Sequence, residues 1–183
     1  MRIKLLATTA AFALVLATGA MAVSDPMVGG AAMFPTKNII ENAVNSKDHT
    51  TLVAAVKAAD LVTTLEGPGP FTVFAPTNAA FAALPAGTVD TLLKPENKGK
   101  LTQILTYHVV SGRYDKMALE AAIKTAPGGK AMLKTAQGET LTVADANGAL
   151  WVTDHAGNTA QITIPDVYQS NGVIMVVDKV LMP

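Results

Sequence analysis

The chain has 183 residues, enough for one domain or two, and half of them are apolar whereas only 15% are charged. This composition can fill a core and argues against intrinsic disorder. Basic and acidic residues number 14 each and form no basic run, which argues against nucleic acid or an anionic membrane surface as a partner. Cysteine is absent, which excludes disulfides, thiolate metal ligands and thiol nucleophiles.

Residues 1–22 have the pattern of a secretory signal peptide. Arg2 and Lys4 precede an uncharged run, which ends in an A-x-A pattern at 20–22. A positive start, an apolar middle and such an ending are typical of a cleaved signal. We therefore expect an exported protein, in the periplasm or secreted to the cell surface, with no membrane span after cleavage. The alternative is an uncleaved anchor, because the uncharged run 5–23 is long enough to cross a bilayer.

The remaining chain divides into a short leading segment and one domain. Residues 23–36 mix glycine, proline and small side chains without a period, so we expect a linker there and the domain over 37–183. Helices are expected within 36–48, 49–67, 77–87, on both sides of Pro95 in 88–106, and within 115–126, with a buried strand over 71–76. Alternating runs predict strands within 130–138, 139–148, 149–158, 159–167 and 171–183. Helices mostly in the first half and strands in the second predict an α+β fold with a mainly antiparallel sheet.

Tyr107 and His108 lie side by side in an apolar stretch that we expect to be extended from residue 107 onwards. Neighbours in a strand point to opposite faces, so the two rings cannot act together on one substrate atom. We expect His108 to be buried and to hydrogen-bond the loop that carries Thr77 and Asn78. The Tyr107 ring should lie on the core, with its hydroxyl near water or a polar group.

The sequence contains no pattern for hydrolytic or metal chemistry. It has no G-x-S-x-G motif, in which a strained turn presents a nucleophilic serine. The three histidines, His49, His108 and His155, lie in different contexts and lack the spacing of metal ligands. We therefore expect no enzyme, no cofactor and no metal site.

Three segments in register resemble the fasciclin-type (FAS1) domain family. The segment FTVFAPTNAAFAALP at 71–85 matches the first conserved block of the family, Tyr107-His108 matches its Tyr-His motif, and SNGVIMVVDKVLMP at 170–183 matches its last block. The resemblance covers about residues 37–183. Its structural positions here are Thr77, Asn78, Phe81, Gly172 and Asp178. One position departs from the family pattern. Met175 occupies a position where the family usually has histidine, and we expect this methionine to fill the core.

The resemblance implies a wedge of β-sheets packed with several helices, which acts outside the cell as an adhesion module. In some animal members, the Tyr-His region and an Asp-Ile pair before the last block contact integrins. The matching residues are Tyr107, His108, Asp166 and Val167, which are therefore candidate partner-binding residues. Because the signal peptide has a bacterial character, we expect a surface or matrix protein or a polysaccharide as partner rather than an integrin.

A second class of function is a periplasmic carrier, which would bind a small ligand in an apolar pocket. Trp151 could line such a pocket, because strand alternation places it opposite Leu150 and Val152. The interpretation we favour is that Trp151 covers a second, partly buried face of the sheet. A carrier predicts a thermal shift with an extracted ligand, whereas a module that serves adhesion alone predicts none.

Overall fold

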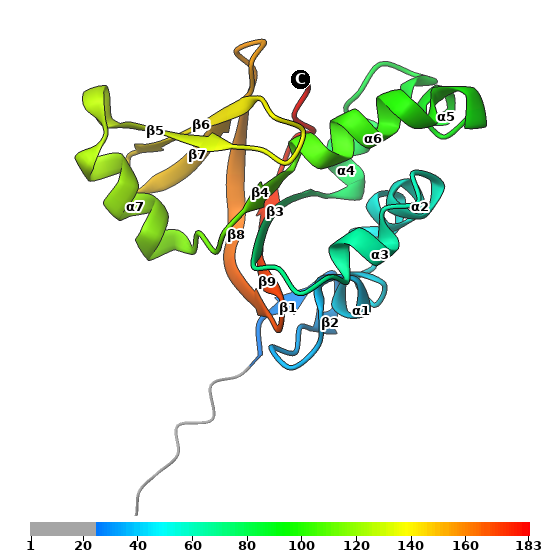
Figure 1. Cartoon of the computed structure of the whole chain (residues 1–183), viewed down its shortest axis with the longest axis horizontal. Helices are drawn as coiled ribbons and strands as arrows, with labels where there is room; N and C mark the ends of the chain where they lie inside the picture. The colour runs from blue at the N-terminus through cyan, green and yellow to red at the C-terminus, as the bar shows by residue number, and fades with distance from the viewer. Residues whose placement is uncertain (1–24) are drawn as a thin grey trace, which may run out of the picture.

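The structure is a computed structural model that describes residues 25–183. The predicted signal peptide lies outside the described residues. Within them the α-helices are α1 (Ile39–Ala43), α2 (Thr50–Ala58), α3 (Val62–Leu65), α4 (Asn78–Ala82), α5 (Thr88–Leu92), α6 (Lys98–Tyr107) and α7 (Lys116–Thr125). Two 3-10 turns, η1 (Pro95–Asn97) and η2 (Pro127–Gly129), precede α6 and follow α7. Every helix except α7 ends before residue 108, as predicted (Figure 1).

Side-chain caps fix the starts of several short helices. The Asn38 carboxamide accepts from the Glu41 backbone N–H, and the Glu41 carboxylate accepts from that of Asn38, which forms a capping box before α1. Thr77 caps α4 through the N–H of Ala80, and Asp115 caps α7 in the same way. Helices as short as α1 and α4 are not stable alone, so these caps and the packing beneath them determine where they form.

Nine strands make up the β structure of the described chain. They are β1 (Met27–Val28), β2 (Ala31–Ala32), β3 (Phe71–Pro76), β4 (Val109–Ser111), β5 (Lys130–Lys134), β6 (Thr140–Ala146), β7 (Ala149–Thr153), β8 (Thr159–Gln169) and β9 (Gly172–Val177). Seven of them form one sheet in the order β4-β3-β9-β8-β7-β6-β5. All neighbours in this sheet are antiparallel except β3 and β9, which confirms the α+β class with a mainly antiparallel sheet.

The parallel pair of β3 and β9 brings the two ends of the domain sequence together. Phe71 pairs with Gly172, and the register continues to Pro76 and Val177. A Cβ atom at Gly172 would collide with the backbone of Phe71, so a glycine is required where the strands begin. The segments 71–85 and 170–183 are therefore adjacent in space.

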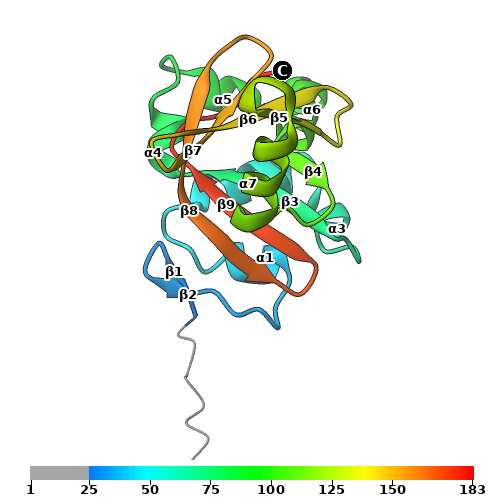
Figure 2. The ribbon, with the colours of Figure 1, turned by 90° about the vertical axis from the view of Figure 1, so that its left-hand side faces the viewer.

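The sheet curls until its two edges nearly meet. Val110 of β4 forms a bridge with Thr135, just after β5, and the Ala136 N–H donates to the Val109 carbonyl at 2.7 Å. Figure 2 shows α7 lying across this curled part of the sheet. A nearly closed sheet leaves few free strand edges, which protects the domain from edge-to-edge association.

Two apolar cores lie on the two sides of β3 and β9. The inner cluster fills the curled sheet and includes Leu119 and Ile123 of α7, whereas the outer cluster lies between β3, β9 and the helices α1–α6. Met175 is completely buried in the inner cluster, which confirms that it fills the core. Trp151 is half-buried on the opposite face of β7 from Leu150 and Val152, as alternation predicts.

The prediction of a linker over residues 23–36 is wrong for residues 25–36, which are the part that the structure describes. Residues 27–32 form the hairpin β1–β2, and Val28 and Met33 are buried in the outer cluster. The Lys47 N–H donates to the Gly29 carbonyl at 3.1 Å, which ties the hairpin to the turn after α1. Strands of two residues carry no detectable period, so composition alone could not distinguish this hairpin from a linker.

Replacing Met33 by alanine should lower the free energy of unfolding by about 3 kcal/mol, because it leaves a cavity in a core. Met33 is 2% exposed, whereas Met27 in the same hairpin is 59% exposed and is the matched control. Urea denaturation of the mature chain measures the free energy of unfolding of both variants. Equal midpoints for Met33→Ala and Met27→Ala would show that the hairpin does not belong to the core.

Candidate functional site

Tyr107 is the last residue of α6 and is completely buried, not part of a strand. Its hydroxyl donates to the Thr140 carbonyl at 3.3 Å and accepts from the His155 N–H at 2.8 Å. Tyr107 thus joins α6 to β6 and to the turn after β7, and the prediction of a core ring with a polar partner is confirmed. Burial raises the pKa of Tyr107, so the hydroxyl stays protonated and can donate.

His108 is buried directly after α6, as predicted, but its predicted partners are wrong. Its Nδ1 lies 2.8 Å from the Ile104 carbonyl, and its Nε2 accepts from the Leu181 N–H at 3.0 Å. The helix continues through Tyr107, so the ring is directed towards the C-terminal segment and not towards Thr77. The strand alternation assumed from residue 107 does not apply at this point.

The loop after β3 is held by other residues. Asn78 Oδ1 accepts from the Thr51 N–H at 3.0 Å, and Asn78 Nδ2 donates to the Lys47 carbonyl at 2.8 Å. Phe81 is buried in the outer cluster, and Asp178 Oδ1 accepts from the Gln161 N–H at 2.7 Å. These matched positions therefore connect parts of the chain that are distant in sequence.

The two hydrogen bonds of His108 require one tautomer. The Ile104 carbonyl can only accept and the Leu181 N–H can only donate, so Nδ1 carries the proton and Nε2 carries none. Burial lowers the pKa of His108 to about 4, although the Ile104 carbonyl and the Asp154 carboxylate act in the opposite direction. The ring is therefore neutral at pH 7 and serves as a link between α6 and the C-terminal segment.

Acidification should destabilise the domain through His108. Its pKa rises from about 4 in the folded chain to the ordinary 6.5 on unfolding, so the unfolded chain binds the extra proton. This contribution to stability is fully present above pH 6.5 and is lost as the pH falls towards 4, to a total of about 3 kcal/mol.

Denaturant unfolding between pH 4 and pH 7 measures this effect. His108→Gln should be less stable at pH 7 and should show a shallower pH dependence than the wild type. His155→Gln is the matched control, because His155 is exposed. An identical pH dependence in wild type and His108→Gln would contradict the assignment.

Of the four candidate partner-binding residues, only Asp166 is partly exposed. The other three, Tyr107, His108 and Val167, are buried, so their side chains offer no surface to a partner. Asp166 lies at an irregularity of β8 with a positive φ of 59°. Its Oδ1 accepts from the Lys116 N–H at 2.6 Å, which ties β8 to the first residue of α7.

Side chains from β8 and the start of α7 surround Asp166. The Arg113 guanidinium lies 5.5 Å from the centre of the Tyr168 ring and donates to the Gln169 carbonyl at 3.1 Å. The Tyr168 hydroxyl donates to Asp115 Oδ2 at 3.3 Å. Desolvation and the carboxylates of Asp166 and Asp115 raise the pKa of Tyr168.

We call this surface the α7 patch; it consists of Arg113, Asp115, Asp166, Tyr168 and the exposed Met117. Of these five residues, only Asp166 was predicted from the sequence as a partner contact. Tyr168 could have been found by alternation, because it follows the buried Val167 and must face the other way. Arg113 and Asp115 come near it only through the tertiary fold.

Residues 25–183 bring together no group of three or more histidine, aspartate or glutamate side chains that could hold a metal ion. In the same part of the chain, no helix is long and apolar enough to span a membrane. The described residues also line an apolar cavity of about 50 Å³ beside the outer cluster, and Trp151 does not line it.

The model of the fasciclin domain matches residues 47–183, so the chain belongs to the fasciclin (FAS1) domain family. The fold agrees: a FAS1 domain pair from the insect cell adhesion molecule fasciclin I superposes with a TM-score of 0.71 at 17% identity, over 80% of this chain and 51% of that one.

Bacterial relatives are more similar in sequence. The Synechocystis protein sll1483 is 46% identical over 94% of this chain and 91% of its own length. The immunogenic protein MPB70 of Mycobacterium bovis is 38% identical over 77% of this chain and 66% of its own. The cell surface glycolipoprotein MPB83 of the same species is 35% identical over 87% of this chain and 61% of its own length.

Proposed function

We propose that this protein is an exported adhesion module without catalytic activity, and that it contacts a protein or polysaccharide of the cell surface or matrix through the α7 patch. The observation that carries the proposal is the position of Asp166. The family resemblance makes Asp166 a candidate contact, and the exposed aromatic ring of Tyr168 lies beside it with the cationic Arg113 against that ring. The cell surface location in the name of the relative MPB83 supports export to the surface.

The composition of the α7 patch fits a protein or sugar partner. Tyrosine, arginine and methionine are enriched in interfaces, where they combine a large contact area with a polar group. Tyr168 is 39% exposed and Met117 is 76% exposed, so both can contribute apolar area. The carboxylates of Asp115 and Asp166 supply hydrogen-bond acceptors beside them.

The α7 patch is also held in one arrangement before any partner arrives. Arg113 is held by a backbone carbonyl and by the Tyr168 ring, and the Tyr168 hydroxyl is held by Asp115. Side chains that are already ordered lose less entropy on binding, so each contact contributes more to affinity.

Replacing Tyr168 or Asp166 by alanine should reduce attachment of cells that carry the variant as their only copy. Attachment should fall towards that of a strain with the gene deleted, because the central aromatic contact or the acceptor is removed. Attachment to a surface coated with the organism's own matrix is the readout.

Asp145→Ala is the matched control for Asp166→Ala. Its carboxylate also accepts one backbone N–H, that of Gly148 at 3.0 Å, in an exposed turn outside the α7 patch. Thermal melting separates a lost contact from a lost fold. Each change removes one hydrogen bond, worth about 1 kcal/mol, and Asp166→Ala adds about 1 kcal/mol because an alanine then takes the positive φ of that position. Unchanged attachment in the deletion strain would refute the adhesion role, and unchanged attachment in both patch variants would refute the α7 patch.

A further inference from the structure

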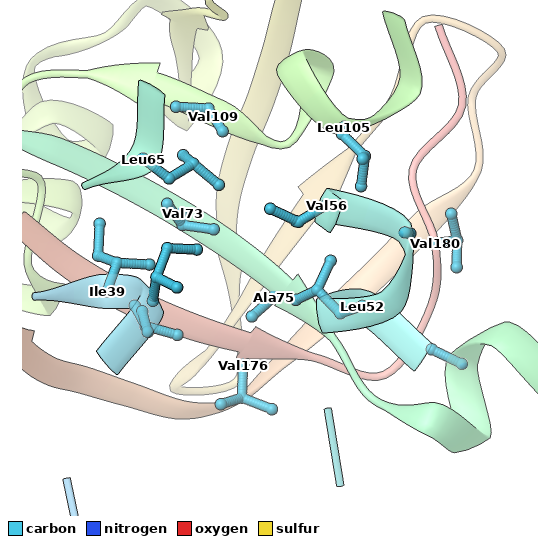
Figure 3. Close-up of a cluster of buried hydrophobic side chains, with 14 of the residues drawn as sticks. Ile39, Leu52, Val56, Leu65, Val73, Ala75, Leu105, Val109, Val176 and Val180 are labelled. Atoms are coloured by element: carbon cyan, nitrogen blue, oxygen red, sulfur yellow. The ribbon is translucent and has the colours of Figure 1, made fainter. Parts of the chain in front are cut away.

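The cavity of about 50 Å³ lies between the helices α1–α3 and strand β3. Figure 3 shows Leu52 and Val56 of α2 facing Val73 and Ala75 of β3 across this region. The free volume equals the share of about two water molecules in the liquid, and a buried water needs two to four polar partners. The wall is apolar almost throughout, so an alkyl chain fits it better than water does.

His49 supplies a polar atom deep in this wall. The residue is 3% exposed, and its Nδ1 lies 2.9 Å from Ser46 Oγ. Its Nε2 is buried and makes no hydrogen bond of good geometry within residues 25–183, although the ring lies against the backbone of Ala75. Burial lowers the pKa of His49, so the ring is neutral at pH 7 and attracts no anion into the interior.

Lys57 stands at the other end of α2. Among the described residues that line the cavity, it alone is exposed, and the neighbouring Val53 and Val62 are partly buried. Lys57 forms no ion pair within the described part of the chain. Since each residue advances a helix by about 1.5 Å, the cavity wall extends about 12 Å along α2 from His49 to Lys57.

We infer that the cavity binds the alkyl chain of a medium-chain carboxylate, with the carboxylate at Lys57 and the chain running along α2 towards His49. The chain gains by leaving water for an apolar wall. The carboxylate stays near the surface, where the unpaired ammonium group can donate to it. A chain longer than the free volume enters by displacing Val53 and Val62, which line the cavity and are only partly buried.

Octanoate tests the inference, because it is soluble as a monomer. Titration of the mature protein, followed by backbone NMR and thermal melting, should show one saturable site with shifts in α2 and β3 and a raised melting temperature. Octyltrimethylammonium should bind at least fivefold more weakly, because Lys57 repels it, and acetate should not bind. Equal affinity for the anionic and cationic chains, or no saturable site for octanoate, would overturn the inference.

Two variants locate the head group. Lys57→Gln should weaken octanoate binding about fivefold, as expected for a partly exposed ion pair. Lys124→Gln is the matched control, because Lys124 also lies in the last turn of a helix, α7, and does not line the cavity. Equal affinity in the two variants would overturn the assignment of Lys57.

Two further variants test where the alkyl chain of the ligand lies and in which direction it runs along α2. Val53→Trp should fill the mouth and abolish binding while the melting temperature is retained. His49→Phe should leave the affinity within twofold of the wild type, because no charge of the ligand reaches His49. If His49→Phe abolishes binding in a folded protein and Lys57→Gln does not, the carboxylate lies at the wrong end and the inference fails.

Discussion

The whole fold depends on burying β9 on both faces. Val173, Met175 and Val177 point into the inner cluster, whereas Ile174 and Val176 point into the outer one. A strand without a solvated face has to be covered from both sides, and each cover comes from a different part of the chain. The helices before residue 108 cover one side, and α7 with the curled strands β5–β8 covers the other. The parallel pairing with β3 holds the first strand of the main sheet against the last.

Regular periods explain what the sequence could predict. The α+β class, the mainly antiparallel sheet and the direction of Trp151 follow from alternating patterns in the strands, whereas the burial of Met175 follows from its place in the apolar run of β9. The end of α6 was missed because Tyr107 continues the helix by a single residue, and that residue decides where His108 points. The β1–β2 hairpin was missed because it is stabilised by contacts with α1 and the turn after it, which local sequence does not reveal.

In the candidate site, too, some residues could be predicted from the sequence and others are brought together only by the tertiary fold. Asp166 was reached through a resemblance, but the neighbours that give it a surface, Arg113 and Asp115, come from the loop before α7 and meet β8 only in the folded chain. The family resemblance made Tyr107 and His108 candidate partner contacts, yet both are buried and connect α6 to later segments. A motif can therefore mark a region of function without marking the side chains that touch the partner.

One stretch of β8 serves both sites. Asp166 and Tyr168 belong to the α7 patch, whereas Val167 between them is buried and lines the apolar cavity. Opposite orientation of neighbours in a strand is what permits this arrangement. The cavity wall and the outer surface therefore share one length of backbone, so a substitution at Val167 would disturb the packing at the cavity and the support of Asp166 and Tyr168 together.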